Sequence, residues 1–226
     1  MSIPFYFAAE ENEALPQKSR RYAQLGFGFH EDGSLRLPER SIPGAPAVIN
    51  DRFLPAKAPG SSVLDTLAEA CASGCFLDFE RPVSEVSAAI AVGLQRRLRA
   101  KMTVPRALRS LCPEADVQIP GLLCNNWERF VRDVRAEYGD RWVLEIIPWR
   151  RRTPFPVTGS LTGCLRTALC DYRVENGSAT FYDTEASVKE KLAIAERYGC
   201  QAGITLLREY EQISQFEHIT KSAQFR

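Results

Sequence analysis

Short apolar runs alternate with longer amphipathic segments along most of the chain. The runs are rich in β-branched and aromatic residues, whereas the segments between them repeat apolar residues at helical spacing, as Leu64, Leu67 and Cys71 do. This alternation is typical of βα units, which build a parallel sheet. Strands are expected at 3–8, 23–29, 47–50, 74–79, 101–104, 116–119, 142–147 and 203–207. Helices are expected at 62–72, 83–99, 126–138 and 185–198.

Eight parallel strands with interleaved helices predict an α/β fold, a short TIM-like (β/α)8 barrel formed by residues 1–226 as a single domain. Such a barrel typically has roughly 250 residues, and this chain has 226. Some helices must therefore be replaced by loops, and we expect one such loop in the segment 36–59, which is rich in Pro and Ala. Two further strands at 171–174 and 179–182, joined through Asn176-Gly177, predict a small hairpin insertion.

Charge and composition narrow the functional classes. Lys and Arg number 29 against 28 Asp and Glu, which leaves no basic field for a nucleic-acid partner. The seven cysteines include no C-x-x-C pair and are accompanied by only two histidines, so we expect neither a metal nor a cofactor. The apolar run at 3–9 is too short for a signal peptide or a membrane span, which predicts a reduced, cytoplasmic protein with no membrane partner.

The most informative stretch is 74–80, a predicted buried strand that ends in two carboxylates. Residues two apart on a strand point to the same side, so Asp78 and Glu80 are expected to project together from its carboxyl end. Two neighbouring carboxylates repel each other and one of them keeps its proton, which is how a general acid is made. The alternative is structural: Asp78 caps the following segment and Glu80 pairs with Arg81.

Other candidate site residues fall at or near predicted strand ends, where the active sites of such barrels lie. Asn50 ends the third strand, Gln118 lies in the sixth and Glu145 in the seventh. Trp149 follows the seventh strand and either stacks on a sugar face or packs in the core. The neighbouring Arg150-Arg151-Arg152 either binds an anionic group or forms a solvated loop.

Three segments share motifs with one known family. Residues 73–80, Ser-Gly-Cys-Phe-Leu-Asp-Phe-Glu, match the pattern D-G-x-D-x-D-[WF]-E at the glycine, the last aspartate, the aromatic residue and the glutamate. Residues 181–191 are similar to a stretch YDDxxSxxxK, and residues 198–207 to a passage G-x-x-G-V-M-x-W. In these segments the chain resembles glycoside hydrolase family 18, the chitinase-like barrels.

The resemblance implies a role for each carboxylate. Glu80 is similar to the family's general acid, and Asp78 to the aspartate that orients the 2-acetamido group of an N-acetylglucosamine unit. In that mechanism the acetamido oxygen attacks the anomeric carbon in place of an enzyme nucleophile. The implied partner is a glycan or a small carbohydrate, and the chain gives no indication of a protein partner.

Two departures from the family pattern leave the activity open. Phe76 stands where the family has an inner aspartate that shares a proton with the position of Asp78. The family's Met-x-Tyr-Asp motif has no counterpart at 118–123, so its tyrosine is missing or is replaced by Tyr172 or Tyr182.

Three functions follow as alternatives. The first is a divergent glycosidase-like protein that hydrolyses or binds N-acetylglucosamine-containing glycans. The second is a non-catalytic carbohydrate-binding or scaffold protein on the same barrel. The third is a barrel enzyme that acts on a phosphorylated small molecule through its arginine triplet. For the first, the catalytic residues are Glu80 and Asp78, and the expected ligand contacts are Trp149, Gln118, Asn50, Tyr182 and Glu145.

Overall fold

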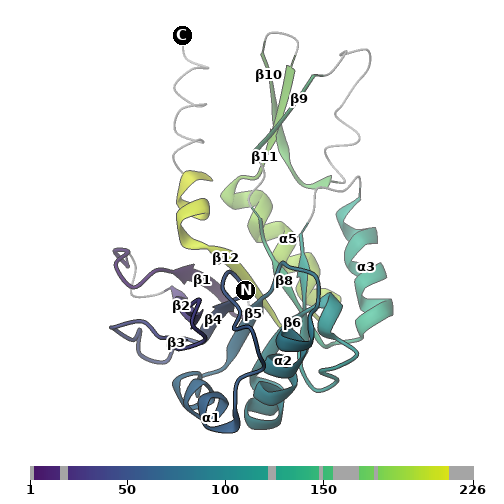
Figure 1. The fold of residues 1–226 in the computed structure, drawn as a ribbon. Helices are drawn as coiled ribbons and strands as arrows, with labels where there is room; N and C mark the ends of the chain where they lie inside the picture. The colour runs from purple at the N-terminus through teal and green to yellow at the C-terminus, as the bar shows by residue number, and fades with distance from the viewer. Residues whose placement is uncertain are drawn as a thin grey trace. The chain divides into compact units, whose positions relative to one another are not determined.

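A computed structural model describes residues 3–15, 20–121, 126–147, 150–154, 168–175 and 178–213. Eight parallel strands form a barrel in the order β1-β12-β8-β7-β6-β5-β4-β2, which pairing of β1 with β2 closes (Figure 1). The predicted short TIM-like barrel and its eight strands are therefore confirmed, with small shifts at the strand ends. The barrel strands are β1 (Phe5–Ala9), β2 (Arg21–Phe29), β4 (Ala47–Asn50), β5 (Cys75–Asp78), β6 (Met102–Pro105), β7 (Asp116–Pro120), β8 (Trp142–Glu145) and β12 (Ala202–Leu206).

The four predicted helices are also present, as α1 (Ser61–Ala70), α2 (Glu85–Leu98), α3 (Trp127–Tyr138) and α5 (Glu185–Arg197). Two of them begin with a reciprocal capping box. Ser84 and Ser87 exchange hydrogen bonds at the start of α2, and Thr184 and Ser187 do so at the start of α5. Short 3-10 turns, η1 (Arg99–Lys101) and η2 (Arg106–Leu108), flank β6. No helix among the described residues combines the length and the apolar character that a membrane span needs.

The predicted loop at 36–59 holds no helix; it contains β4 and follows the two-residue strand β3 (Leu35–Arg36). A single buried side chain attaches this loop to β2. The Gln24 Nε2 donates to the carbonyl oxygen of Arg40 at 2.5 Å, and its Oε1 accepts from the Ile42 N–H at 2.8 Å. The part of the loop before β4 is therefore held in place although it contains no helix or strand of its own.

The chain divides into two compact units. One comprises Phe5–Ile119 and Arg141–Val143, and includes α1, α2 and the strands from β1 to β6. The other comprises Met1–Pro4, Pro120–Asp140 and Leu144–Arg226, and includes α3, α5 and β12. The two units share the strands of one barrel, and the single domain over residues 1–226 stays a prediction.

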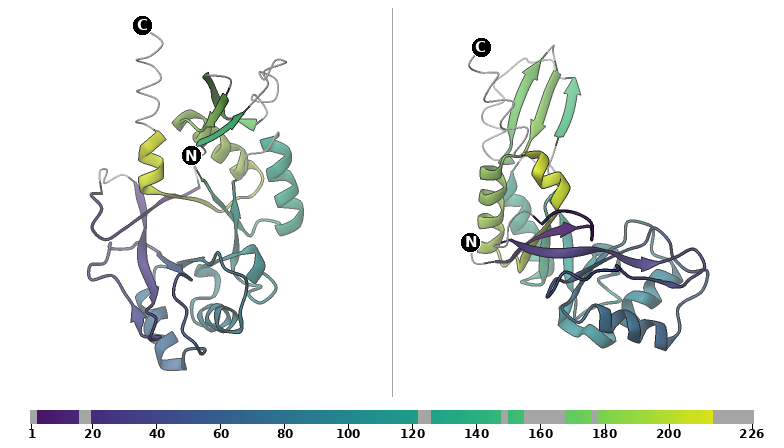
Figure 2. Two further views of the ribbon diagram at one scale, coloured as in Figure 1. Left: turned by 45° about the horizontal axis from the view of Figure 1, so that its top comes forward. Right: turned by 90° about the vertical axis from the view of Figure 1, so that its left-hand side faces the viewer.

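The predicted hairpin insertion is confirmed but incomplete. β10 (Asp171–Glu175) and β11 (Ser178–Tyr182) pair antiparallel, and the expected Asn-Gly turn between them lies outside the described residues. A third strand, β9 (Arg150–Pro154), pairs with β11 and completes a small separate sheet (Figure 2). The arginine triplet thus begins a strand rather than forming a loop.

Alternating residues of β4, β5 and β6 build the core of the first unit. Ile49, Leu77 and Val104 are fully buried in one cluster with helix residues such as Leu67 and Ile90. Because successive strand residues point to opposite faces, the residues between them face the inside of the barrel. The helices α1 and α2, which lie side by side, cover the outer face (Figure 1).

Gly74 allows β5 to start beside β6. Its φ angle is +116°, and a Cβ atom at this position would lie 3.0 Å from the carbonyl oxygen of Lys101. Its own carbonyl accepts from the Ala47 N–H at 2.9 Å, at the beginning of the β4–β5 pairing. The glycine of the 73–80 motif is therefore required by the backbone.

We expect Gly74→Ala to lower the free energy of unfolding by about 1–3 kcal/mol, because alanine adds backbone strain and a close contact. Gly60→Ala is the control, since Gly60 has a φ of −68° and open space around its Cβ position. Urea unfolding followed by circular dichroism compares the two variants. Equal losses would contradict a special role for Gly74.

Candidate functional site

The candidate site lies at the carboxyl ends of adjacent strands in the first unit. Asn50, the last residue of β4, is in register with Asp78, the last residue of β5. Both side chains are half-buried, and both alternate with residues of the helix-facing cluster. They therefore lie on the inner face of the barrel, where Asp78 was expected.

Glu80 differs from the expectation in one respect. Strand β5 ends at Asp78, so Glu80 lies two residues beyond the strand and its direction does not follow from strand alternation. Its side chain is exposed, and within the described part of the chain it forms no ion pair with Arg81 or any other residue. Phe79, between the two carboxylates, is buried in the helix-facing cluster.

Asp51 fixes the backbone that follows Glu80. Its side chain is only 5% exposed, and its Oδ2 accepts from the Arg81 N–H at 2.8 Å. The hydrogen bond joins the end of β4 to the turn after β5. Glu80 is therefore attached to a fixed backbone at both sides, by Phe79 in the core and by Arg81 at Asp51.

Gln118 continues the same row of inner-face residues. The β5–β6 pairing sets Phe76 beside Thr103, and the β6–β7 pairing sets Pro105 beside Gln118. Its Oε1 is buried and accepts no hydrogen bond from any residue that the structure describes. A buried acceptor without a partner is costly, so a ligand or an ordered water is the natural donor here.

Phe76 fills the inside of the barrel next to Asp78. It is 5% exposed, and its ring meets the ring of Tyr6 on β1 edge to face, with centroids 5.7 Å apart. A pair of rings in this geometry packs well and offers no proton acceptor. The inner aspartate of the family pattern thus has no substitute at this position.

Three predicted ligand contacts remain, namely Glu145, Tyr182 and Trp149. Glu145 ends β8 in the second unit and is half-buried, and its carbonyl accepts from the Gly121 N–H at 2.7 Å. Tyr182 ends β11, where the structure defines only the backbone, and Trp149 lies outside the described residues. The roles of all three stay predictions.

The described cysteines contribute to packing and are not reactive thiols. All five are buried: Cys71, Cys75, Cys112, Cys170 and Cys200. Burial raises the pKa of Cys71 to about 12 and that of Cys112 to about 11, so neither forms a thiolate at neutral pH. The described residues also contain no group of histidine, cysteine and carboxylate side chains that could hold a metal ion.

The second family-like segment forms a buried charge network in the second unit. The Lys191 Nζ lies 2.6 Å from the Asp183 Oδ1, with the two side chains 3% and 1% exposed. Ser187 Oγ donates to the same oxygen at 3.0 Å, and the Lys191 Nζ also lies 5.1 Å from the centre of the Trp127 ring. The Asp, Ser and Lys of the motif thus hold α5 to its preceding strand and to α3. Their role here is structural.

Comparison with known proteins places this geometry among solved barrels. No family model and no curated protein sequence matches the chain. A GH18 chitinase from Cycas revoluta in complex with (GlcNAc)3 has a TM-score of 0.55 at 12% identity, over 91% of this chain and 95% of that one. The spore cortex-lytic enzyme SleL of Bacillus megaterium QM B1551 has a TM-score of 0.53 at 13% identity, over 94% of this chain and 73% of that one.

A class V chitinase from Nicotiana tobaccum is a third structure of this kind, with a TM-score of 0.51 and 10% identity over 90% of this chain and 93% of that one. At these identities the likeness concerns the fold. The resemblance to the chitinase-like barrels, stated above from three short motifs, is thereby confirmed for the architecture of nearly the whole chain.

We expect Lys191→Met to lower the free energy of unfolding by about 3–5 kcal/mol, because it leaves the Asp183 carboxylate buried without its cation. Lys189→Met on the same helix is the control and should change little, since Lys189 is exposed and lies 3.9 Å from Glu185. Urea unfolding measures both. Adding Asp183→Asn to Lys191→Met should recover part of the loss, and equal behaviour of the two lysine variants would refute the network's importance.

Proposed function

We propose that this protein hydrolyses N-acetylglucosamine-containing glycans by substrate-assisted acid/base chemistry, with Glu80 as the acid. The observation that carries the proposal is the pair of carboxylates at the end of the fourth barrel strand. Asp78 is half-buried on the inner face, whereas Glu80 is exposed to solvent. An exposed acid beside a half-buried carboxylate is accessible to a substrate that enters at the carboxyl ends of the strands, where barrel enzymes have their sites.

Each group has a distinct task in this proposal. Glu80 gives its proton to the glycosidic oxygen as the bond to the anomeric carbon breaks, and the substrate's acetamido oxygen forms the new bond to that carbon. The Asp78 carboxylate accepts a hydrogen bond from the acetamido N–H and so holds the acetamido oxygen toward the anomeric carbon. The Glu80 carboxylate then takes a proton from the water that opens the cyclic intermediate, which returns the acid to its starting state.

Two further observations support a sugar as the ligand. Asn50 and Gln118 provide polar groups on the same inner face, and the Gln118 Oε1 is a buried acceptor for which no described residue is the donor. The Cycas revoluta chitinases of the same fold were crystallised with GlcNAc oligomers and with allosamidin. A carbohydrate with several hydroxyl donors suits these groups.

A second candidate function is glycan binding without hydrolysis. It is favoured by Phe76, which packs against Tyr6 where the proton-sharing aspartate of the family pattern would lie. A phenyl ring at this position cannot share a proton with Asp78 as the family's aspartate would. Binding would then persist through Asn50, Gln118 and Asp78 while turnover is slow.

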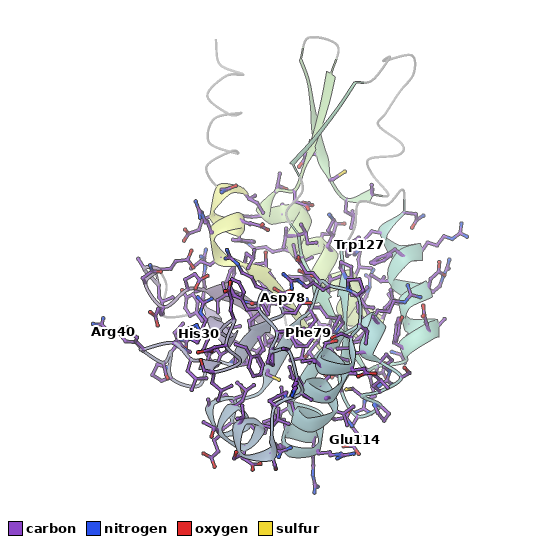
Figure 3. All side chains as sticks on the ribbon, viewed as in Figure 1. His30, Arg40, Asp78, Phe79, Glu114 and Trp127 are labelled. Atoms are coloured by element: carbon purple, nitrogen blue, oxygen red, sulfur yellow. The ribbon has the colours of Figure 1, made fainter. Side chains whose placement is uncertain are left out.

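The main test is Glu80→Gln, which keeps the shape of the side chain but removes its proton. We expect it to abolish hydrolysis of a chromogenic N-acetylglucosamine oligomer, with a loss of at least about 100-fold in kcat/KM. Glu114→Gln is the matched control, because Glu114 is also exposed and lies before the amino end of β7, away from Asp78 (Figure 3). Equal rates in parent and Glu80→Gln exclude Glu80 from the mechanism. Glycan binding by a parent that shows no turnover supports the second candidate.

A second variant tests whether the missing aspartate limits the rate. We expect Phe76→Asp to raise turnover above that of the parent, because the new carboxyl can share a proton with Asp78. Phe76→Asn has nearly the same shape and leaves the same gap beside Tyr6, but it has no carboxyl proton to share, so it should give no gain. Both variants lose a buried ring and must first be shown to be folded by near-ultraviolet circular dichroism. A folded Phe76→Asp variant no faster than Phe76→Asn would show that another feature limits the site.

A further inference from the structure

A cavity lies at the amino ends of β1, β2 and β4, whereas Asn50 and Asp78 lie at carboxyl ends of barrel strands. Its volume is about 510 Å³, within the range of small-molecule sites. All of the described residues that line it belong to the first unit. They come from the start of β2, from β1 and from the loop before β4.

The charged residues among the described lining of this cavity are all basic. Arg20 and Arg21 line it, and none of the described lining residues is acidic. Arg21 is exposed and forms no ion pair with any residue in the described ranges. The Arg20 guanidinium lies 4.6 Å from the centre of the Phe7 ring, which limits its orientation. An exposed guanidinium such as that of Arg21, in a concave site with no acidic residue among its described lining, favours a carboxylate or a phosphate.

An aromatic ring lies beside Arg21. Tyr6 and Tyr22 both line the cavity, and Tyr6 is in register with Arg21 on the neighbouring strand. In-register neighbours point to the same face, so a ring and a guanidinium lie next to each other. A ligand that stacks on the tyrosine would present a substituent to the arginine.

The opposite wall of the cavity is preformed. It consists of residues 42–45, which Gln24 fixes through its bonds to Arg40 and Ile42. The Gln24 N–H also donates to the Pro46 carbonyl at 2.8 Å, and the Ala45 N–H donates to the Ile42 carbonyl at 3.1 Å. Gln24 itself is 2% exposed. A wall held by buried hydrogen bonds loses little entropy when a ligand binds.

We propose that this amino-end cavity binds a small ring compound that carries a carboxylate or a phosphate, with Arg21 as the principal anion contact. The site is independent of the proposed glycosidase chemistry, because it shares no residue with the strand ends that hold Asp78 and Glu80. A charged ring compound bound here would lie at the amino ends of the strands rather than at the carboxyl ends, where barrel enzymes react.

Isothermal titration of the full chain tests the proposal with three probes that share one phenyl ring: benzoate, phenyl phosphate and uncharged benzyl alcohol. We expect at least one anion to bind more tightly than benzyl alcohol, and the preferred anion identifies the group. Arg21→Gln should weaken anion binding by about tenfold, because a charge-assisted contact is lost. Arg40→Gln is the control and should bind as the parent does, because the exposed Arg40 side chain points away from the molecule (Figure 3).

Several results would overturn the proposal. These are no binding of either anion, equal binding of the anions and benzyl alcohol, or equal losses in Arg21→Gln and Arg40→Gln. Salt dependence of the parent's titration gives a readout that needs no variant, since binding through guanidinium groups should weaken as KCl is raised. Glu80→Gln should leave the anion titration unchanged, which keeps this test separate from the hydrolysis test.

Discussion

Closing eight parallel strands into a barrel encloses an interior that side chains must fill, and this constraint governs the rest of the structure. The helices α1 and α2 cover the outer faces of β4, β5 and β6. Along each of these strands, apolar residues that face the helices alternate with residues that face the barrel interior. Tyr6 and Phe76 supply the bulk inside. The polar residues Asn50 and Asp78 follow at the carboxyl ends of β4 and β5, on the same inner face. The candidate site is thus the place where the demand for apolar filling stops.

The same constraint explains how much of the fold was predictable from the sequence. Each barrel strand carries a short apolar run, and the helices between the strands repeat apolar residues at helical spacing. Both kinds of element therefore leave a pattern in the sequence. Strand β9 left no such pattern, because it begins with three arginines, which have no strong strand preference. Its partner β11 determines its conformation through pairing, which a local pattern does not contain.

The candidate site was predictable in part. The position of Asp78 follows from strand alternation and from its register with Asn50. The exposure of Glu80 does not, because the strand ends two residues earlier and the turn is held by a hydrogen bond between Asp51 and Arg81, thirty positions apart. The burial of Lys191 could not be predicted either, since a lysine on an amphipathic helix is nearly always solvated. Only the three-dimensional contact with Asp183 shows why this one is not.

The residues of the shared motifs therefore fall into two groups, those with a structural role and those with a proposed chemical role. Gly74, Asp183 and Lys191 have backbone and packing roles that any protein with this architecture could need, so their presence supports the fold more than the chemistry. Glu80 is a motif residue for which the described part of the structure gives no such role. The bond between Asp51 and Arg81 has a practical consequence for engineering. A segment around Glu80 transplanted into another barrel would need its neighbouring strand end as well, because residues 78–81 are one half of a two-part module whose other half is Asp51.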